Sequence, residues 1–222
     1  MAAGRGVRAG GAKQFWMLGG KTLLERAVEA FVPMVQGVAV AAPEGEGEQV
    51  AGLLAGVGVP VVVVTGGGHR NASLEAAVAK LGEGFDLQPG DVLLTHDAAR
   101  PLVSRDIIAR HVAHFSQNSN AVTNTAVPVA DTIVRGGEGQ LTGTLERSEL
   151  FAVQTPQGFC YGDFVKVFGG ASKTQKGQAT DPCSLFFDAG YAVDLLAGEP
   201  NNFKITQAAD LRMAEGLIQE SE

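Results

Sequence analysis

Short apolar runs alternate with stretches of helical spacing along most of the chain. Leu24, Val28 and Phe31 recur at helical intervals, and a short apolar run at 38–42 follows them. The same order then repeats: apolar runs at 59–64 and 92–95 are each followed by a stretch of helical spacing. Strands and helices in alternation predict an α/β fold, with a doubly wound and mostly parallel sheet of the Rossmann type.

Local signals refine this prediction. The run at 59–64 holds four consecutive valines, which is typical of a strand buried on both faces. Ser104 is suited to cap the helix that follows the strand at 92–95. Thr180-Asp181-Pro182 predicts the start of a helix, because it combines a capping carboxylate with proline at the first helical position. A last helix is predicted from the spacing of apolar residues that include Leu211 and Leu217.

Residues from about 127 to 153 interrupt the alternation. They contain Pro128, Gly136, Gly137 and Gly139, with short threonine-rich runs between them. This pattern predicts a β-hairpin arm inserted into one domain that covers residues 1–222, and not a linker between two domains.

Composition narrows the class of protein. The 222 residues include 17 Lys and Arg against 24 Asp and Glu, so the net charge is −7, which argues against nucleic-acid binding. No apolar run approaches the length of a membrane span, and the N-terminus has no apolar signal segment. Cys160 and Cys183 are too few and too far apart for a zinc site or a disulfide framework. We therefore expect a cytoplasmic protein with reduced thiols that inserts into no membrane.

Candidate chemistry lies where strands end. The N-terminal stretch is rich in glycine and carries Arg8 and Lys13, as expected for a loop that binds an anion. A flexible terminus with solvated charges is the alternative. After the valine run, three glycines at 66–68 allow a planar base to lie against the main chain, where Ser73 can read its edge. The alternative is an ordinary turn capped by Asn71 or Ser73.

A second group of polar residues follows the strand at 92–95. Asp97 is suited to bind a divalent cation or a ribose hydroxyl, and Arg100 is suited to bind a phosphate. The alternative is that the two residues form an ordinary ion pair at the surface. We expect His96 to be structural, and His111 and His114, one turn apart, to lie on a solvated helix face. Lys204 lies in a short β-like run, where an exposed cation at a strand end could meet a phosphate.

Several separated motifs, taken in order, resemble one family: the 2-C-methyl-D-erythritol 4-phosphate cytidylyltransferases of isoprenoid precursor biosynthesis. The matching segments are Ala2-Ala3-Gly4 with Gly6, Arg8 and Lys13; His96-Asp97-Ala98-Ala99-Arg100-Pro101; Pro128-Val129-Ala130-Asp131-Thr132; Gln154-Thr155-Pro156-Gln157; and Lys204-Ile205-Thr206. The resemblance implies an enzyme that joins CMP from CTP to a sugar-alcohol phosphate and releases pyrophosphate. It also implies Mg²⁺ as cofactor and a homodimer with interlocked arms.

The resemblance also implies roles for individual residues. The catalytic residues are Arg8 and Lys13, which stabilise charge on the triphosphate, and Arg147 and Lys204, which position the attacking phosphate, Arg147 from the partner's arm. The nucleotide is bound by Ala2, Ala3, Gly4, Gly6, Gly67, Ser73, Asp97 and Ala98, with Asp97 also near Mg²⁺. The sugar phosphate is bound by Arg100, Thr132, Thr155 and Thr180.

One departure from the family pattern concerns the start of the chain. The family has an apolar strand directly before the Ala-Ala-Gly loop, whereas Met1 directly precedes Ala2 here. We therefore expect this strand to be missing, and its neighbours to be left unpaired; a start placed too far downstream is the favoured explanation. Two other functions stay open: the sister activity on ribitol 5-phosphate, and a catalytically impaired nucleotide-binding homologue.

Overall fold

The structure is a computed structural model that describes residues 1–3, 12–118 and 121–219. The strands are β1 (Met17–Leu18), β2 (Lys21–Thr22), β3 (Val38–Ala42), β4 (Val61–Thr65), β5 (Val92–Thr95), β6 (Val122–Pro128), β7 (Val134–Gly137), β8 (Gln140–Thr144), β9 (Phe151–Cys160) and β10 (Asp194–Ala197). The α-helices are α1 (Leu23–Phe31), α2 (Gly47–Leu53), α3 (Arg70–Gly84), α4 (Arg105–Gln117), α5 (Tyr161–Gly170), α6 (Lys173–Gln178), α7 (Pro182–Asp188) and α8 (Ala208–Gln219). Short 3-10 helices are η2 (Lys13–Phe15), η3 (Val32–Met34) and η4 (Arg147–Glu149).

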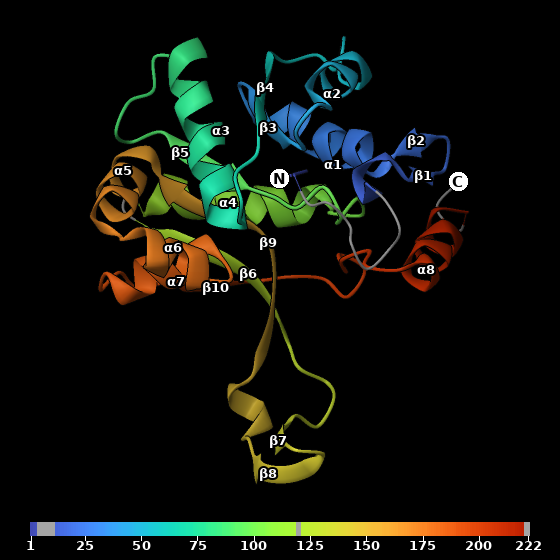
Figure 1. Ribbon diagram of the computed structural model, residues 1–222, viewed down its shortest axis with the longest axis vertical. Coiled ribbons are helices and arrows are strands. Elements are labelled where there is room, and N and C mark those ends of the chain that lie inside the picture. Colours follow the sequence, from blue (N-terminus) through green and yellow to red (C-terminus); the bar gives the residue numbers. More distant parts are fainter. Residues whose placement is uncertain (4–11, 119–120, 220–222) are drawn as a thin grey trace.

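The main strands form two sheets with helices packed on them. A four-stranded sheet has the order β10-β6-β9-β5, and a two-stranded sheet pairs β3 with β4 (Figure 1). The pairs β3–β4 and β10–β6 are parallel, whereas β9 runs antiparallel to both β5 and β6. The α/β class is confirmed, and the sheet is mixed because the long strand β9 returns from the arm in the opposite direction.

Local signals in the sequence explain where the helices begin. Thr22 and Glu25 form a capping box at α1, and the face of α1 that carries Leu24 and Val28 is buried. Ser104 caps α4 through the N–H of Ile107, as predicted. Asp181 caps α7, which begins with Pro182, as predicted. None of the helices in the described ranges is long and apolar enough to cross a bilayer.

Two predictions about burial are wrong. The valines of β4 are only half-buried, because β4 lies at the edge of its sheet and not in the centre. His111 is fully buried and not on a solvated face, since its two ring nitrogens lie 2.7 and 2.8 Å from the hydroxyls of Thr123 and Thr125. His111 lies on the side of α4 that packs against β6, whereas His114 lies at the surface and pairs with Asp194.

The first residues of the chain lie between the two sheets. The N–H of Ala2 donates to Ala41 O of β3 over 2.9 Å, and the N–H of Ala98 donates to Met1 O over 3.1 Å. Met1 and Ala2 therefore join β3 to the segment after β5 at one end. In the described ranges, no strand pairs with both β3 and β5.

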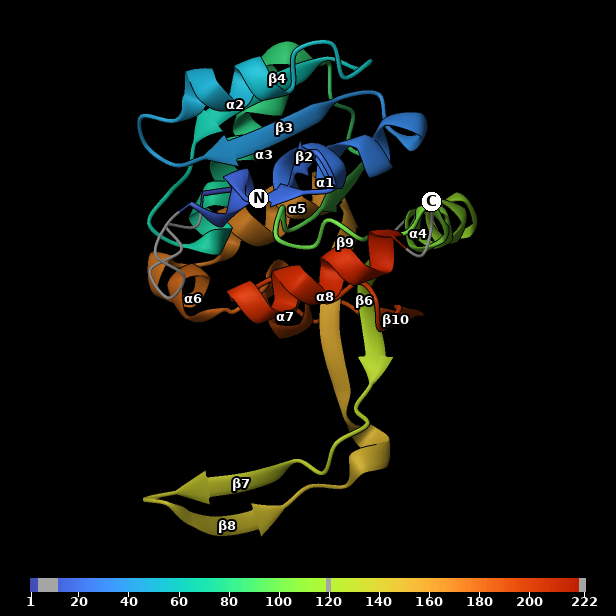
Figure 2. The same cartoon turned by 90° about the vertical axis from the view of Figure 1, so that its right-hand side faces the viewer.

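The segment between β6 and β9 projects from the rest of the molecule as a hairpin arm. Figures 1 and 2 show β7 and β8 at its tip, well away from the sheets. These two strands pair antiparallel, and their residues are almost all exposed. The predicted hairpin is thus present between the predicted limits.

Candidate active site

Asp97 is the centre of a group of charged side chains just beyond the end of β5. Its Oδ1 lies 3.2 Å from Arg70 Nη2, and its Oδ2 lies 3.0 Å from Lys204 Nζ. Burial alone raises the pKa of this carboxyl, but the positive charges of Arg70 and Lys204 outweigh it and hold the pKa of Asp97 well below its usual range. Asp97 is therefore ionised at neutral pH although its side chain is only 12% exposed.

Arg70 is a residue of this group that the sequence analysis missed. It is the first residue of α3, and besides Asp97 it donates to Gln157 Oε1 over 2.9 Å. Gln157 in turn donates to Asn124 and to Asp181. The available signal was its position at the start of a helix, two residues after the glycine run.

Arg100 and Thr155, which the resemblance assigns to the sugar phosphate, lie in the same group. Arg100 donates to Asn202 O over 2.7 Å, and its Nε is 4.0 Å from Asp97 Oδ2. The hydroxyl of Thr155 accepts from the N–H of Asp97 over 3.1 Å and lies 2.9 Å from His96 Nδ1. Burial lowers the pKa of His96 to about 3, so this ring is neutral and structural, as expected.

The glycine run after β4 forms a close contact with Ala3 and Ser73. The Ser73 hydroxyl accepts from the N–H of Gly67 over 3.0 Å. A Cβ on Gly66 would lie 2.2 Å from Ala3 Cβ, so the first residues and this turn touch closely. The predicted cap of α3 is wrong in detail, because His69 and not Asn71 or Ser73 accepts from the first turn of the helix.

Lys13 and Lys204 come together from opposite ends of the chain. Lys13 Nζ donates to Thr206 O over 2.9 Å, two residues beyond Lys204. Lys204 itself is 46% exposed and lies in an irregular segment, so the predicted β-like run is wrong. Its placement next to Asp97 comes from the N–H of Ile205, which donates to Ala99 O.

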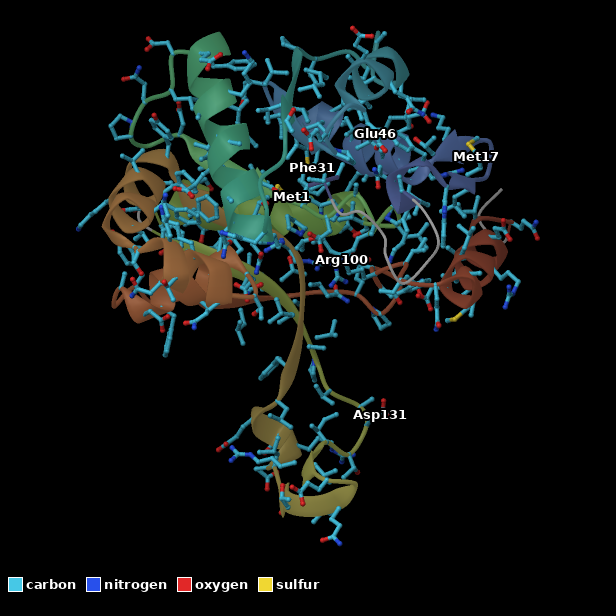
Figure 3. The ribbon with its side chains drawn as sticks, viewed as in Figure 1. Met1, Met17, Phe31, Glu46, Arg100 and Asp131 are labelled. Carbon is cyan, nitrogen blue, oxygen red and sulfur yellow. The ribbon has the colours of Figure 1, made fainter. Side chains whose placement is uncertain are left out.

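Other predicted residues lie away from Asp97 or outside the description. Thr132 and Arg147 are exposed on the arm, where Arg147 donates to Ala130 O. Figure 3 shows Asp131 of the arm far from Arg100 of the body. Thr180 is exposed beside Asp181, at the border of the group. The residues Gly4, Gly6 and Arg8 lie outside the described residues.

Metal-ligating residues are sparse near Asp97. In the parts of the chain that the structure describes, no three His, Cys, Asp or Glu side chains gather as a metal site would require. Asp97 is thus a single carboxylate surrounded by cations, which fits a metal shared with a ligand's phosphates better than an all-protein site.

Comparisons with known proteins agree with this geometry. The sequence matches the family described as IspD: 2-C-methyl-D-erythritol 4-phosphate cytidylyltransferase over residues 1–220. It is 41% identical to the 2-C-methyl-D-erythritol 4-phosphate cytidylyltransferase of Rhodococcus opacus, covering 99% of this chain and 93% of that protein. It is 33% identical to the ribitol-5-phosphate cytidylyltransferase of Lactiplantibacillus plantarum, covering 99% and 96%. The crystal structure of the 2-C-methyl-D-erythritol 4-phosphate cytidylyltransferase from Thermus thermophilus superposes with a TM-score of 0.76 at 33% identity, covering 95% of each chain. The chain belongs to the IspD family and is a nucleotidyltransferase of the cytidylyltransferase class.

Proposed function

We propose that this chain transfers CMP from CTP to 2-C-methyl-D-erythritol 4-phosphate, in the non-mevalonate route to isoprenoids. The observation that carries the proposal is the gathering of Arg70, Arg100 and Lys204 around Asp97, with Lys13 bonded two residues from Lys204. A triphosphate and a sugar phosphate together carry many negative charges, and such a cationic group suits them.

The chemistry needs positioning more than proton transfer. An oxygen of the acceptor phosphate attacks the α-phosphorus of CTP, and the bond from that phosphorus to the oxygen of the β-phosphate breaks, releasing pyrophosphate. The acceptor phosphate is already ionised, so no general base is required. Catalysis then depends on alignment and on cations that stabilise the charge as it builds up. Lys13 and Arg8 act on the triphosphate, and Lys204 acts on the attacking phosphate.

The nucleotide pocket lies on the glycine turn. Gly67 offers main-chain groups with no side chain in the way, and the Ser73 hydroxyl already accepts a hydrogen bond from this turn. Ala3 packs against the same turn, so these residues suit the flat face and edge of cytosine. Gly4 and Gly6, together with Ala2 and Ala98, complete the nucleotide site, while Asp97 is suited to the ribose.

Mg²⁺ is the cofactor that the proposal includes. When bound, it would neutralise phosphate charge, and Asp97 would be its protein ligand, since Mg²⁺ typically takes one or two carboxylates plus substrate phosphates. Lys204 now bonds Asp97 Oδ2, so this lysine is placed to leave the carboxylate and meet the acceptor phosphate when the ligands enter.

The arm is the dimerisation element of the proposed single domain. It carries half-exposed or exposed apolar side chains, among them Ile133, Val134 and Leu141, which are 40%, 45% and 64% exposed. Such a surface favours association with a second copy. Arg147 and Thr132, which lie on the arm, would then complete the partner's sugar-phosphate pocket, with Arg100, Thr155 and Thr180 on the body.

Pyrophosphate release from CTP, measured with each acceptor in turn, tests the proposal. We expect a higher kcat/KM with 2-C-methyl-D-erythritol 4-phosphate than with ribitol 5-phosphate. The reverse order would assign the ribitol activity, which the Lactiplantibacillus relative represents. No release with either acceptor from a folded protein that binds CTP would leave only a nucleotide-binding homologue.

Variants test the named residues. Lys13→Ala and Lys204→Ala should each lower kcat by ~100-fold or more, the scale of losing one transition-state contact. Lys21→Ala is the matched control, because Lys21 is exposed and pairs with Glu29 at the surface. Equal activity of Lys204→Ala and Lys21→Ala would remove Lys204 from the reaction.

Mixing two inactive variants tests the role of the arm. If Arg147 acts in the partner's site, Lys204→Ala and Arg147→Ala subunits should regain activity when mixed, because each mixed dimer then holds one intact site. If Arg147 acts within its own chain, mixing should restore nothing.

A further inference from the structure

Two side-chain amides, those of Gln154 and Asn202, bind each other beside the candidate active site. Asn202 Nδ2 donates to Gln154 Oε1 over 3.0 Å and to Thr155 O over 2.8 Å. Gln154 Nε2 donates to Glu199 O over 2.8 Å, and Gln154 Oε1 accepts from the N–H of Glu199 over 3.3 Å. The amide pair therefore ties β9 to the 199–202 segment.

Both amides are buried, and stability alone is a poor explanation for this. Asn202 has no exposed surface, and Gln154 is 6% exposed. Among the described residues, Asn202 Oδ1 has no hydrogen-bond partner. An unpaired buried oxygen costs stability, and an apolar side chain of similar shape would avoid that cost. The amide at position 202 is better explained by what it holds in place.

Gln154 lies where β9 passes from the arm into the body. Residues 151–153 of β9 are exposed, and the residues from Gln154 to Cys160 are buried. Figure 2 shows β9 running from the arm into the sheet. Gly198 leaves room for the Gln154 side chain, because a Cβ on Gly198 would lie 2.6 Å from Gln154 Oε1. The contact between the amide pair and the 199–202 segment thus depends on a glycine at position 198.

The 199–202 segment leads directly to Lys204. The chain is fixed again at Ile205, which is fully buried and whose N–H donates to Ala99 O over 2.8 Å. Lys204 therefore lies between two anchors, the amide pair on one side and Ile205 on the other. Its Nζ reaches Asp97 Oδ2 over 3.0 Å, although nearly half of its side chain is exposed. The main chain on both sides, more than side-chain packing, places Lys204 at the site.

Arg100 is bonded to the same segment. Its Nη1 donates to Asn202 O over 2.7 Å, and its Nη2 donates to Val153 O over 3.3 Å, next to Gln154. One guanidinium group thus contacts the main chain beside each member of the amide pair. A shift of the segment relative to β9 would therefore move Arg100 and Lys204 together.

We propose that Gln154 and Asn202 are positioning residues for the acceptor phosphate, and that they act through Lys204 and Arg100. In the proposed function, on which this inference rests, these two cations bind the sugar-alcohol phosphate. A phosphate held by two cations needs both at fixed positions, because a misplacement of about 1 Å can lower the rate ~100-fold. The buried amide pair supplies that constraint through the main chain.

The same geometry predicts a smaller effect on CTP than on the acceptor. Lys13, which is proposed to act on the triphosphate, bonds Thr206 O, which lies beyond the anchor at Ile205. The glycine turn that is proposed to bind cytosine belongs to a separate segment, between β4 and α3. Loss of either amide should therefore disturb Lys204 and Arg100 while leaving these CTP contacts in place.

Steady-state pyrophosphate release by Asn202→Ala and Gln154→Ala, with CTP and acceptor varied separately, tests the proposal. Each variant should lower kcat/KM for 2-C-methyl-D-erythritol 4-phosphate by about 10- to 100-fold, the upper value being the cost of a 1 Å misplacement. The KM for CTP should be unchanged. Val167→Ala is the control, because it removes buried apolar contacts of α5: it should lower Tm and leave kcat and both KM values unchanged.

A substitution outside the amide pair gives a second measurement. Gly198→Ala places a Cβ against Gln154 Oε1 and should reduce use of the acceptor in the same way. Gly169→Ala, on the exposed side of α5 where a Cβ would meet nothing within 4 Å, should have no such effect. This comparison remains decisive if Asn202→Ala does not fold.

Combining Asn202→Ala with Lys204→Ala separates positioning from a general loss of structure. If Asn202 acts through Lys204, the double variant should lose much less activity than the product of the two single losses, because Lys204 is already absent. Losses that multiply would show that Asn202 acts independently of Lys204.

Hydrogen exchange measures the positioning without any turnover. The N–H groups of Glu199 and Ile205 are bonded at the two ends of the segment that carries Lys204. In Asn202→Ala both should exchange at least about tenfold faster, because their local opening becomes easier. The N–H of Tyr161, which is bonded elsewhere in the body, should exchange at its original rate.

Two kinds of result would overturn the proposal. One is an equal loss for acceptor and CTP, or no loss at all, in a folded Asn202→Ala protein. The other is unchanged exchange at Glu199 and Ile205. Absence of turnover by the unmodified chain with either acceptor would instead refute the proposed function, and the exchange rates would still decide whether the amide pair holds the Lys204 segment.

Discussion

Replacing Arg70 with methionine tests whether the cationic group around Asp97 is energetically coupled. The change keeps the apolar stem of the side chain but removes the hydrogen bonds to Asp97 and to Gln157. Leaving a buried charge without its partner costs ~3–5 kcal/mol. Lys204 still pairs with Asp97, and Arg70 is 22% exposed, so solvent screens part of the interaction. We therefore expect a loss of about 2–3 kcal/mol in the free energy of unfolding.

Urea denaturation of Arg70→Met, Asp97→Asn and the double variant measures this coupling. The two single losses should exceed the double loss by about 1 kcal/mol or more, since the residues are in contact. The expected fall in Tm for Arg70→Met is ~5–10 °C for a chain of this size. Lys21→Met, which breaks an exposed pair with Glu29, is the control and should change stability by less than ~0.5 kcal/mol.

The pH dependence gives a second measurement of the same coupling. The pKa of Asp97 is lowered in the folded state, so its contribution is fully present above the unfolded pKa of about 4 and is lost as the pH falls below that value. Arg70→Met should raise the folded pKa and so reduce the stability lost on acidification. Additive single losses, together with an unchanged acid limb, would refute the idea that Arg70 holds Asp97.

Three further predictions concern the turn, the core and the chain start. Gly67→Ala should weaken CTP binding and lower Tm, because its Cβ would lie 2.6 Å from Ala72 Cβ, whereas Gly68→Ala, with nothing within 4 Å, should change neither in a titration and a melting curve. His111→Ala should cost about 3 kcal/mol or more in urea denaturation, because it leaves a cavity and removes one hydrogen-bond partner from each of two buried threonine hydroxyls. For the chain that begins at Met1, the lowered pKa of its amino group, about 6 against 8, should make stability rise by about 3 kcal/mol between pH 6 and 8, and acetylation of that group should flatten this rise.

Periodicity in the sequence was enough to place most elements. Strand β5 and helix α1 were predicted with nearly their observed limits, because period and capping are local properties. The arm was also visible, since its glycines and threonines interrupt the alternation of strand and helix. The half-buried state of β4 could not be predicted, because four consecutive valines are compatible with an edge strand as well as with a central one.

The candidate site was predicted in its residue types and only partly in its contacts. Asp97 and Arg100 were identified by their position after a strand, which is a local signal. Arg70 was missed, because its role depends on a tertiary contact. Arg70 begins the helix after β4, whereas its partner Asp97 follows β5. His111 was misplaced for a related reason: helical spacing does not say which face of a helix meets the sheet.

The sequence by itself determined the alternation of strands and helices, the inserted arm and the set of cationic and glycine motifs, because each depends on neighbours along the chain. Only the tertiary structure decided which of these motifs meet. It joined Lys13 to the segment after Lys204 and gave Asp97 its two cations. The physical reason is that these contacts depend on how segments far apart in the sequence pack together. A local pattern of residues does not specify that packing.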